Sequence, residues 1–385
     1  MYVGLVSRDW RCAINSTPVL WSCATVDNYT DLQKLCAGLS KSGVLPLHLR
    51  FDLVARNLLD PSMASPSQIH SFLHRAFTSL RPYLYRCTCL DLCTLDGTTT
   101  VALLSVVAPL SFPTLSNLQL DLAHTSRVTA HTALAFALPA LARLVINGGF
   151  LELRSSVYSS LTTLVLRGQL YTQWSHFVTS LTGLVRLQKL EFHDVACFGP
   201  SSYEKVSQLP TLLLPQVRNF KLSASFVSST WILSILSFPG LRRLQLVLPD
   251  LLTLGGLVKV VGRAFRPVRH LELSMMSCSA DGLVSLLAPM TSLLTLDASS
   301  SHHCLGPQLL LAVRDPRSLL PECATIRLPY PTPTSDQHLL SLVDPDPHCR
   351  TWFASLSSSL FIRVDTHPLV KLSYSSYDAS LGHFC

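Results

Sequence analysis

One pattern of nine residues recurs along most of this chain and limits what the chain can fold into. Its form is apolar-x-x-apolar-x-x-apolar-x-apolar. Clear copies are FPTLSNLQL, LPALARLVI, YSSLTTLVL, LVRLQKLEF, LPQVRNFKL, FPGLRRLQL and FRPVRHLEL, which begin at residues 112, 138, 158, 184, 214, 238 and 265. Weaker copies begin at Leu84, Met290 and Leu320. The closing apolar-x-apolar couplet predicts a short strand, because alternate side chains of a strand point to the same face.

The couplets are nearly evenly spaced. Their first apolar residues are separated by 20 to 30 residues, about 26 on average, which is the period of leucine-rich repeats. A unit of this size cannot bury its apolar face alone, so units must stack. An ordinary α/β domain with leucine-rich strands is the alternative, and the regular spacing disfavours it. The ten positions are Leu90, Leu118, Leu144, Leu164, Leu190, Phe220, Leu244, Leu271, Leu296 and Ile326.

The predicted fold is therefore α/β: a leucine-rich-repeat solenoid, a curved horseshoe with parallel strands on the concave face and helices on the convex face. Residues 231–238 and 281–290 carry helical spacing between couplets, with Asp281 as the expected N-cap and Pro289 at the helix end. Residues 45–53 predict an earlier strand, and residues 67–84 predict the first long helix. About ten units fill residues 28–330, and residues 331–385 form an atypical tail, either a cap or partly disordered.

Composition limits the class of protein. Apolar residues make up 48% of the chain and charged residues only 14%, which suggests that a partner normally covers some surface. The net charge of +7 is spread without like-charge runs, so nucleic-acid binding is not expected. The longest apolar stretch contains Pro139 and Arg143, so no membrane span is expected. The N-terminus does not resemble a signal peptide, and we expect an intracellular protein, cytoplasmic or nuclear, with reduced thiols.

The first residues resemble a known motif. LVSRDWR (5–11) and STPVLWSC (16–23) resemble the second half of an F-box, and residues 35–53 resemble the segment that follows it in F-box/leucine-rich-repeat proteins of mushroom-forming (basidiomycete) fungi. The Leu-Pro-x-Glu segment that opens the motif is absent from the sequence. Residues 1–27 are therefore interpreted as a partial F-box. The residues at its adaptor-binding positions are Leu5, Val6, Trp10, Pro18, Leu20 and Trp21.

This resemblance implies a function. It implies a non-catalytic subunit that docks the adaptor of a cullin–RING ubiquitin ligase and recruits a protein substrate through the solenoid. A free-standing scaffold that has lost ligase assembly is the alternative, favoured by the incomplete motif. Trp10 and Trp21 would then cap the open apolar end of the solenoid.

Motifs of enzyme chemistry are not found. The sequence has no phosphate-binding loop, no dinucleotide fingerprint, no His-Glu-x-x-His and no nucleophile elbow, so no catalytic residue and no cofactor are predicted. Cys87, Cys89 and Cys93 surround a strand couplet, and we interpret them as small apolar residues. The run from His302 to Cys304, with Cys278 one repeat earlier, is interpreted as solvated rather than as a metal site.

The residues between the buried leucines of each strand are the candidates for binding a partner on the concave face. Basic residues outnumber acidic ones at these positions, so a polypeptide of modestly acidic character is the expected partner. The alternative is that these are ordinary solvated strand faces. The candidates are Arg143, Arg167, Lys189, Glu191, His193, Lys221, Arg243, Gln245 and Glu272.

Overall fold

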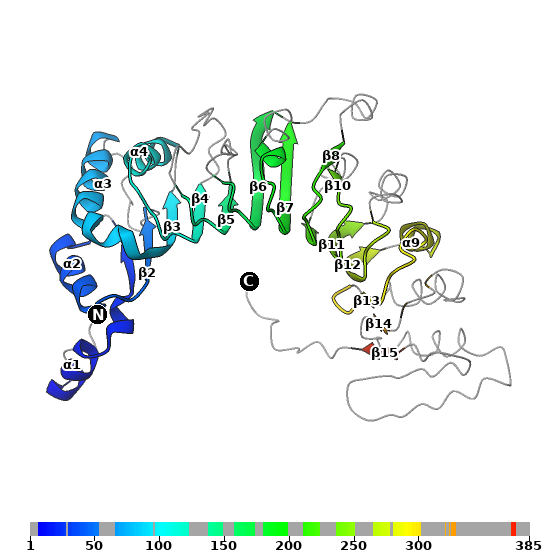
Figure 1. Cartoon of the computed structure of the whole chain (residues 1–385), viewed down its shortest axis with the longest axis horizontal. Helices are drawn as coiled ribbons and strands as arrows, with labels where there is room; N and C mark the ends of the chain where they lie inside the picture. Colours follow the sequence, from blue (N-terminus) through cyan, green and yellow to red (C-terminus); the bar gives the residue numbers. More distant parts are fainter. Residues whose placement is uncertain are drawn as a thin grey trace. The chain divides into compact units, whose positions relative to one another are not determined.

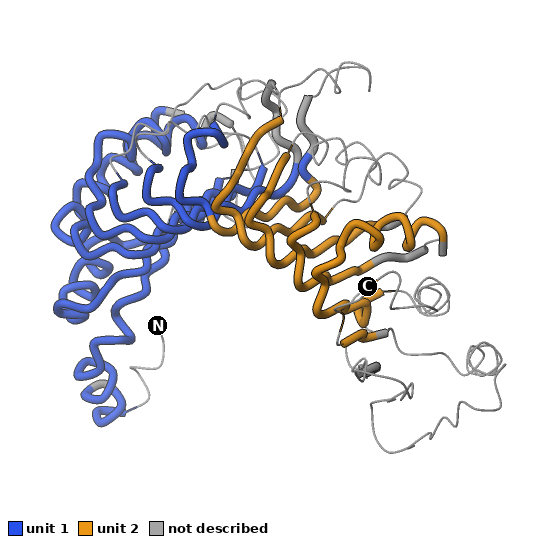
Figure 2. The backbone as a smooth tube through the Cα atoms, turned by 45° about the vertical axis from the view of Figure 1, so that its right-hand side comes forward, with its two compact units in different colours: residues 1–187, 195–199 blue, residues 188–194, 200–385 orange. Residues whose placement is uncertain are grey.

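The computed structural model describes residues 7–27, 30–53, 66–94, 97–122, 138–148, 158–173, 180–198, 211–223, 236–250, 265–277, 280–301, 320, 323, 325–328 and 371–374. The chain divides into two compact units (Figure 2). Unit 1 comprises residues 1–187 and 195–199, and unit 2 comprises residues 188–194 and 200–385.

Unit 1 contains a sheet in which every described pair of neighbouring strands is parallel and follows chain order. Leu90, Leu118, Leu144 and Leu164 stand opposite one another in neighbouring strands, as predicted, with Leu49 before them. All five are buried. The strands, blue to green in Figure 1, are β1 (Cys23–Val26), β2 (Leu47–Asp52), β3 (Cys87–Thr94), β4 (Asn117–Leu122), β5 (Arg143–Asn147) and β6 (Thr163–Gln173).

Unit 2 repeats this arrangement. Leu190, Phe220, Leu244, Leu271, Leu296 and Ile326 are in register and buried, again as predicted. The strands are β7 (Lys189–Phe198, in this unit to Asp194), β9 (Asn219–Ser223), β11 (Arg243–Asp250), β12 (His270–Ser277), β13 (Thr295–Asp297), β14 (Thr325–Leu328) and β15 (Lys371–Tyr374). The predicted α/β leucine-rich-repeat fold, with one parallel strand per repeat, is confirmed.

Aromatic residues replace leucine in the middle of unit 2. Phe220 packs between Phe192 and Phe238, with ring centroids 5.7 Å and 4.7 Å apart. All three rings are almost completely buried, so the larger side chains of adjacent repeats fill one continuous core.

Helices pack against the apolar ladder of unit 1. α2 (Leu32–Lys41), α3 (Pro66–Leu80) and α4 (Gly97–Val107) are its longer helices, and α3 packs on α4 (Figure 1). Phe77 of α3 stacks on Phe51 of β2 with centroids 4.3 Å apart, so α3 lies over the apolar face of the sheet. The predicted long helix at residues 67–84 is confirmed as far as Leu80, where η3 (Arg81–Arg86) begins with Pro82 in its first turn.

Two local expectations need correction. Within the predicted helix at residues 231–238, Leu236–Ser237 form a short strand, β10, instead of a helix. This strand pairs in parallel with β8 (Leu212–Leu213), so its backbone groups form hydrogen bonds with β8 and not within a helix. Residues 231–235 lie outside the described residues. In α9 (Ala280–Leu287), Asp281 lies inside the first turn instead of capping it. The helix ends two residues before Pro289, because proline restricts the residue that precedes it.

The C-terminal region adds one strand to the repeat. β15 pairs in parallel with β14 and places Leu372 opposite Ile326. The rest of residues 331–385 lies outside the described residues. Among the described helices, none combines the length and apolarity that crossing a bilayer requires.

Candidate functional site

The predicted adaptor-binding residues of the N-terminal segment fall into two groups, one packed against the protein and one exposed. Ser7 caps α1 (Arg8–Asn15) by accepting a hydrogen bond from the backbone N–H of Trp10, and η2 (Pro18–Trp21) follows. Trp21 is held in place: its indole N–H donates to the Ile14 carbonyl oxygen across 2.9 Å, and the Lys41 ammonium lies 4.5 Å from its ring centroid. Trp21 therefore joins α1, η2 and α2.

The remaining described residues of this group are exposed. Trp10 is 55% exposed and Leu20 is 46% exposed, and Pro18 is exposed as well. Val19, which the sequence did not single out, is 61% exposed beside them. Trp21 is thus packed against α2 and tied to α1, whereas Trp10 is largely exposed. Leu5 and Val6 lie outside the described residues.

The predicted partner-binding residues lie on the strand face opposite the apolar ladder, which we call the polar face. Arg143 and Arg167 are exposed on this face of unit 1. In unit 2, Glu191 faces Lys221 on the next strand, and Lys221 faces Gln245 on the one after. The fold therefore brings the unit 2 candidates together on four neighbouring strands: Lys189, Glu191, His193, Lys221, Arg243, Gln245 and Glu272.

Most of these charges are already paired within the polar face. Glu191 accepts from Lys189 Nζ at 2.6 Å and from His193 Nε2 at 3.0 Å. Burial raises the pKa of the Glu191 carboxyl, but hydrogen bonds from His193 and Lys189 outweigh burial and lower this pKa to about 2. One strand pair further on, Glu272 accepts from Arg243 at 3.3 Å and from Gln245 at 2.7 Å. The excess of basic residues here is largely offset by these two carboxylates.

A second group of basic residues was missed by the sequence analysis. Arg218, Arg242 and Arg269 directly precede β9, β11 and β12, and all three are exposed. We call them the arginine row. They line a pocket of about 300 Å³ in unit 2. The other lining residues are Pro215, Gln216, Pro239, Gly240, Leu241 and Pro267.

Backbone hydrogen bonds fix the spacing of the arginine row. Arg242 N–H donates to the Arg218 carbonyl at 2.8 Å, and Arg269 N–H donates to the Arg242 carbonyl at 2.9 Å. Each arginine therefore starts one strand spacing, about 4.8 Å, from the next. The sequence held a signal for this row, because an arginine stands immediately before the final strand segment in three consecutive repeats: RNFKL, RRLQL and RHLEL.

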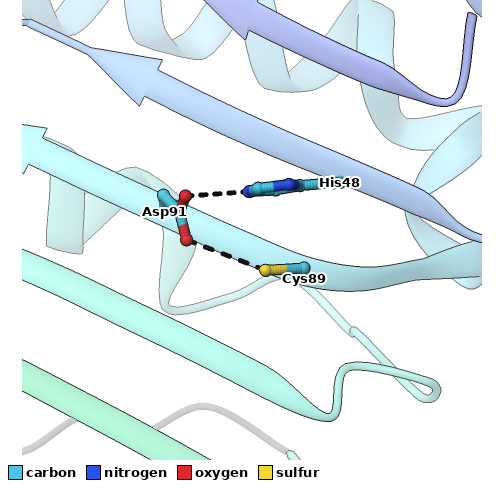
Figure 3. A group of neighbouring side chains, drawn as sticks. All are labelled: His48, Cys89 and Asp91. Atoms are coloured by element: carbon cyan, nitrogen blue, oxygen red, sulfur yellow. Dashed lines mark hydrogen bonds and ion pairs between the residues drawn. The ribbon is translucent and has the colours of Figure 1, made fainter. Parts of the chain in front are cut away.

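The cysteines of β3 differ from one another. Cys87 and Cys93 are buried, as expected for small apolar residues, and burial is the main cause that raises their pKa values to about 12 and about 11. Cys89 is only partly buried; it lies on the polar face, where its thiol donates a hydrogen bond to Asp91 Oδ1 at 3.7 Å. Asp91 Oδ2 lies 2.8 Å from His48 Nε2 (Figure 3). Cys278 and residues 302–304 lie outside the described residues.

Comparisons with known proteins give structural neighbours only. No protein-family model and no curated protein matches the chain. Among solved structures, it is similar to a Bacteroides fragilis protein from a structural genomics consortium, at 13% identity and a TM-score of 0.29. The match covers 48% of this chain and 64% of the Bacteroides fragilis chain, so this chain spans less than two thirds of the length of that protein. It is also similar to an internalin from Listeria monocytogenes, at 11% identity and a TM-score of 0.31, over 87% of this chain and 92% of that one.

The class of protein follows from the repeat itself. A parallel strand recurs with the same leucine position in register in both units. This architecture is that of a leucine-rich-repeat protein.

Proposed function

We propose that this chain is a non-catalytic binding module whose unit 2 holds an acidic segment of a partner polypeptide across the arginine row. The observation that carries the proposal is the pocket, in which Arg218, Arg242 and Arg269 stand on three successive repeats. A guanidinium group presents several N–H donors in a planar fork that matches carboxylates and phosphates.

A contrast with other arginines of unit 2 supports this reading. Arg243 and Arg327 lie on strands, and each forms an ion pair with a carboxylate of a neighbouring strand, Glu272 or Asp297. The arginine row forms no such ion pair with any described residue. Three like charges on adjacent turns repel one another, and an anionic ligand relieves that repulsion.

The pocket favours a polypeptide over a nucleic acid. Proteins that bind single-stranded nucleic acid combine positive charge with aromatic side chains on which bases stack. None of the nine residues that line this pocket is aromatic. The net charge of +7 over 385 residues is also low for a surface that would follow a phosphate backbone.

The test is peptide binding measured by fluorescence anisotropy. The probe is a labelled peptide in which glutamate alternates with serine. We expect each of Arg218→Gln, Arg242→Gln and Arg269→Gln to weaken binding about tenfold, because each removes a charge-assisted hydrogen bond. We also expect added salt to weaken binding. Arg243→Gln is the matched control, since Arg243 is adjacent, exposed and already paired.

Two results would contradict the proposal. One is a triple arginine variant that binds the peptide as tightly as the original chain. The other is an oligonucleotide of equal charge that binds more tightly than the peptide, which would point to a nucleic-acid ligand.

We further propose that the α1–η2 segment docks the adaptor subunit of a cullin–RING ubiquitin ligase, so that the bound partner becomes a ligase substrate. The resemblance to an F-box supports this, as does the exposure of Trp10, Val19 and Leu20, three large apolar side chains within eleven residues. The free-standing scaffold remains the alternative.

Co-elution with purified adaptor distinguishes the two roles. Trp10→Ala combined with Leu20→Ala should abolish co-elution, whereas Val44→Ala, a 90% exposed residue elsewhere in unit 1, should not. A chain that never co-elutes with the adaptor is a scaffold, and its peptide binding at the arginine row is tested separately.

A further inference from the structure

Three side chains that can ligate metals meet on the polar face of unit 1. Cys89 and Asp91 are two residues apart on β3, so both point to the same face of the sheet. His48 on β2 stands opposite Cys89 in the register of these two strands. The possible ligand atoms of these three residues all lie within 4.8 Å of one another (Figure 3).

We propose that His48, Cys89 and Asp91 bind a zinc ion, with water in the fourth position. A tetrahedral zinc ion with bonds of 2.0–2.3 Å holds its ligand atoms about 3.5 Å apart. The present separations include 2.8 Å between His48 Nε2 and Asp91 Oδ2 and 3.7 Å between Cys89 Sγ and Asp91 Oδ1. These two separations lie on either side of the value that zinc requires.

The mixture of donor atoms selects the metal. A thiolate, an imidazole and a carboxylate are all ordinary zinc ligands. Magnesium and calcium prefer oxygen alone, so the sulfur and nitrogen donors disfavour them. The Asp91 carboxylate accepts a hydrogen bond from the Cys89 thiol and shares another with His48 Nε2, so these two bonds hold the three donor groups together at one place.

The site is accessible to an ion. The side chain of His48 is 43% exposed and that of Asp91 is 17% exposed, so a hydrated ion can reach them. Cys23 stands opposite His48 on the other neighbouring strand and is exposed, but it is not in the group whose ligand atoms converge. For this reason we assign the fourth position to water and not to Cys23.

The test uses the full chain, which is first treated with chelator and then titrated with Zn²⁺. Mass spectrometry counts the bound zinc ions, and competition with a chromophoric chelator measures their affinity. Cys89→Ser, His48→Gln and Asp91→Asn should each lose one equivalent of zinc or weaken its binding more than tenfold. Cys12→Ser and Cys23→Ser are matched thiol controls and should keep that equivalent. Thermal unfolding of every metal-free variant checks that it is folded.

Cobalt substitution supplies a second readout. Co²⁺ bound at this site should show an absorption band from one cobalt–thiolate bond, and the band should vanish in Cys89→Ser and persist in Cys23→Ser. The proposal is overturned if the folded Cys89→Ser and His48→Gln variants retain the full zinc content and affinity. It is also overturned if Cys23→Ser loses the band. Neither result bears on peptide binding at the arginine row, which lies in unit 2.

Discussion

A β-carbon placed on Gly240 would lie 2.7 Å from the carbonyl oxygen of Pro215, closer than real β-carbons approach a backbone atom. The turn before β11 therefore packs directly on the turn before β9, and only glycine permits this approach. We expect Gly240→Ala to lower the free energy of unfolding by about 1–3 kcal/mol, because a backbone oxygen cannot swing aside. Urea denaturation measures this loss.

The adjacent Pro239→Ala variant is the control for Gly240→Ala. Pro239 is exposed, so its replacement should change stability by less than about 1 kcal/mol. Gly240 and Pro239 both line the pocket of the arginine row. Equal stability of Gly240→Ala and the original chain would show that the turns separate without cost.

Because of Glu191 on the polar face of unit 2, we expect the free energy of unfolding to fall as the pH becomes acidic. The pKa of Glu191 is lowered from 4.5 to about 2 in the folded chain, so its ionised form stabilises the fold fully above pH 4.5. This contribution is lost as the pH falls from about 4.5 to about 2. Lys189 and His193 contact the carboxylate directly, and Lys221 faces it from β9.

The measurement is urea denaturation of the original chain and of Glu191→Gln across this pH range. We expect the original chain to be more stable at pH 6 and the difference to shrink toward pH 2. A difference that stays constant with pH would mean that Glu191 titrates alike in the folded and unfolded chain, and that the lysine and histidine contacts do not lower its pKa.

From a buried position, Arg86 ties η3 to the end of α2 and the turn that follows it. Its guanidinium donates to Ser42 Oγ at 2.9 Å, to the Leu39 carbonyl at 2.8 Å and to the Leu45 carbonyl at 3.2 Å. Arg86→Lys replaces the planar fork with one ammonium group, which cannot reach all of these acceptors. We expect a loss of about 2 kcal/mol in urea denaturation, because buried acceptors are left unpaired.

Arg81→Lys is the control for this substitution. Arg81 begins the same 3₁₀ helix and is exposed, so it should change stability by no more than about 0.5 kcal/mol. If Arg86→Lys is equally mild, the ammonium group satisfies the acceptors as well as the guanidinium does.

The repeat could be predicted from sequence because its signal is local. Each couplet fixes which residues of a strand face the core, and the constant period then aligns the strands. Even Phe220 and Ile326, which are not leucines, fall in the predicted register. Leu372 was missed because its strand follows β14 at a longer interval than any earlier step, so the period gave no expectation there.

The candidate sites were harder to predict because their contacts are not local. His48 and Asp91 are 43 residues apart, and only the exact register of β2 and β3 brings them together. The pairing of Arg243 with Glu272 likewise depends on neighbouring strands, so a count of basic and acidic residues could not show which charges of the polar face are paired. The arginine row follows the repeat and was predictable in principle.

The two tryptophans of the N-terminal segment should respond differently to truncation. Trp21→Ala removes the hydrogen bond to the Ile14 carbonyl and the contact with the Lys41 ammonium, and we expect a loss of about 2 kcal/mol. Trp10→Ala should change stability by less than about 0.5 kcal/mol, because its side chain is 55% exposed. Urea denaturation of both variants measures this contrast.

The same two substitutions distinguish an effect on folding stability from an effect on adaptor binding. If the adaptor binds this segment, Trp10→Ala should weaken co-elution without changing stability, because an exposed aromatic side chain is free to enter a partner's pocket. Trp21→Ala should weaken both, since the loss of its anchor to α2 releases α1 and η2 together. Equal destabilisation by the two substitutions would show that Trp10 is also packed, and would remove the structural reason for assigning it to a partner.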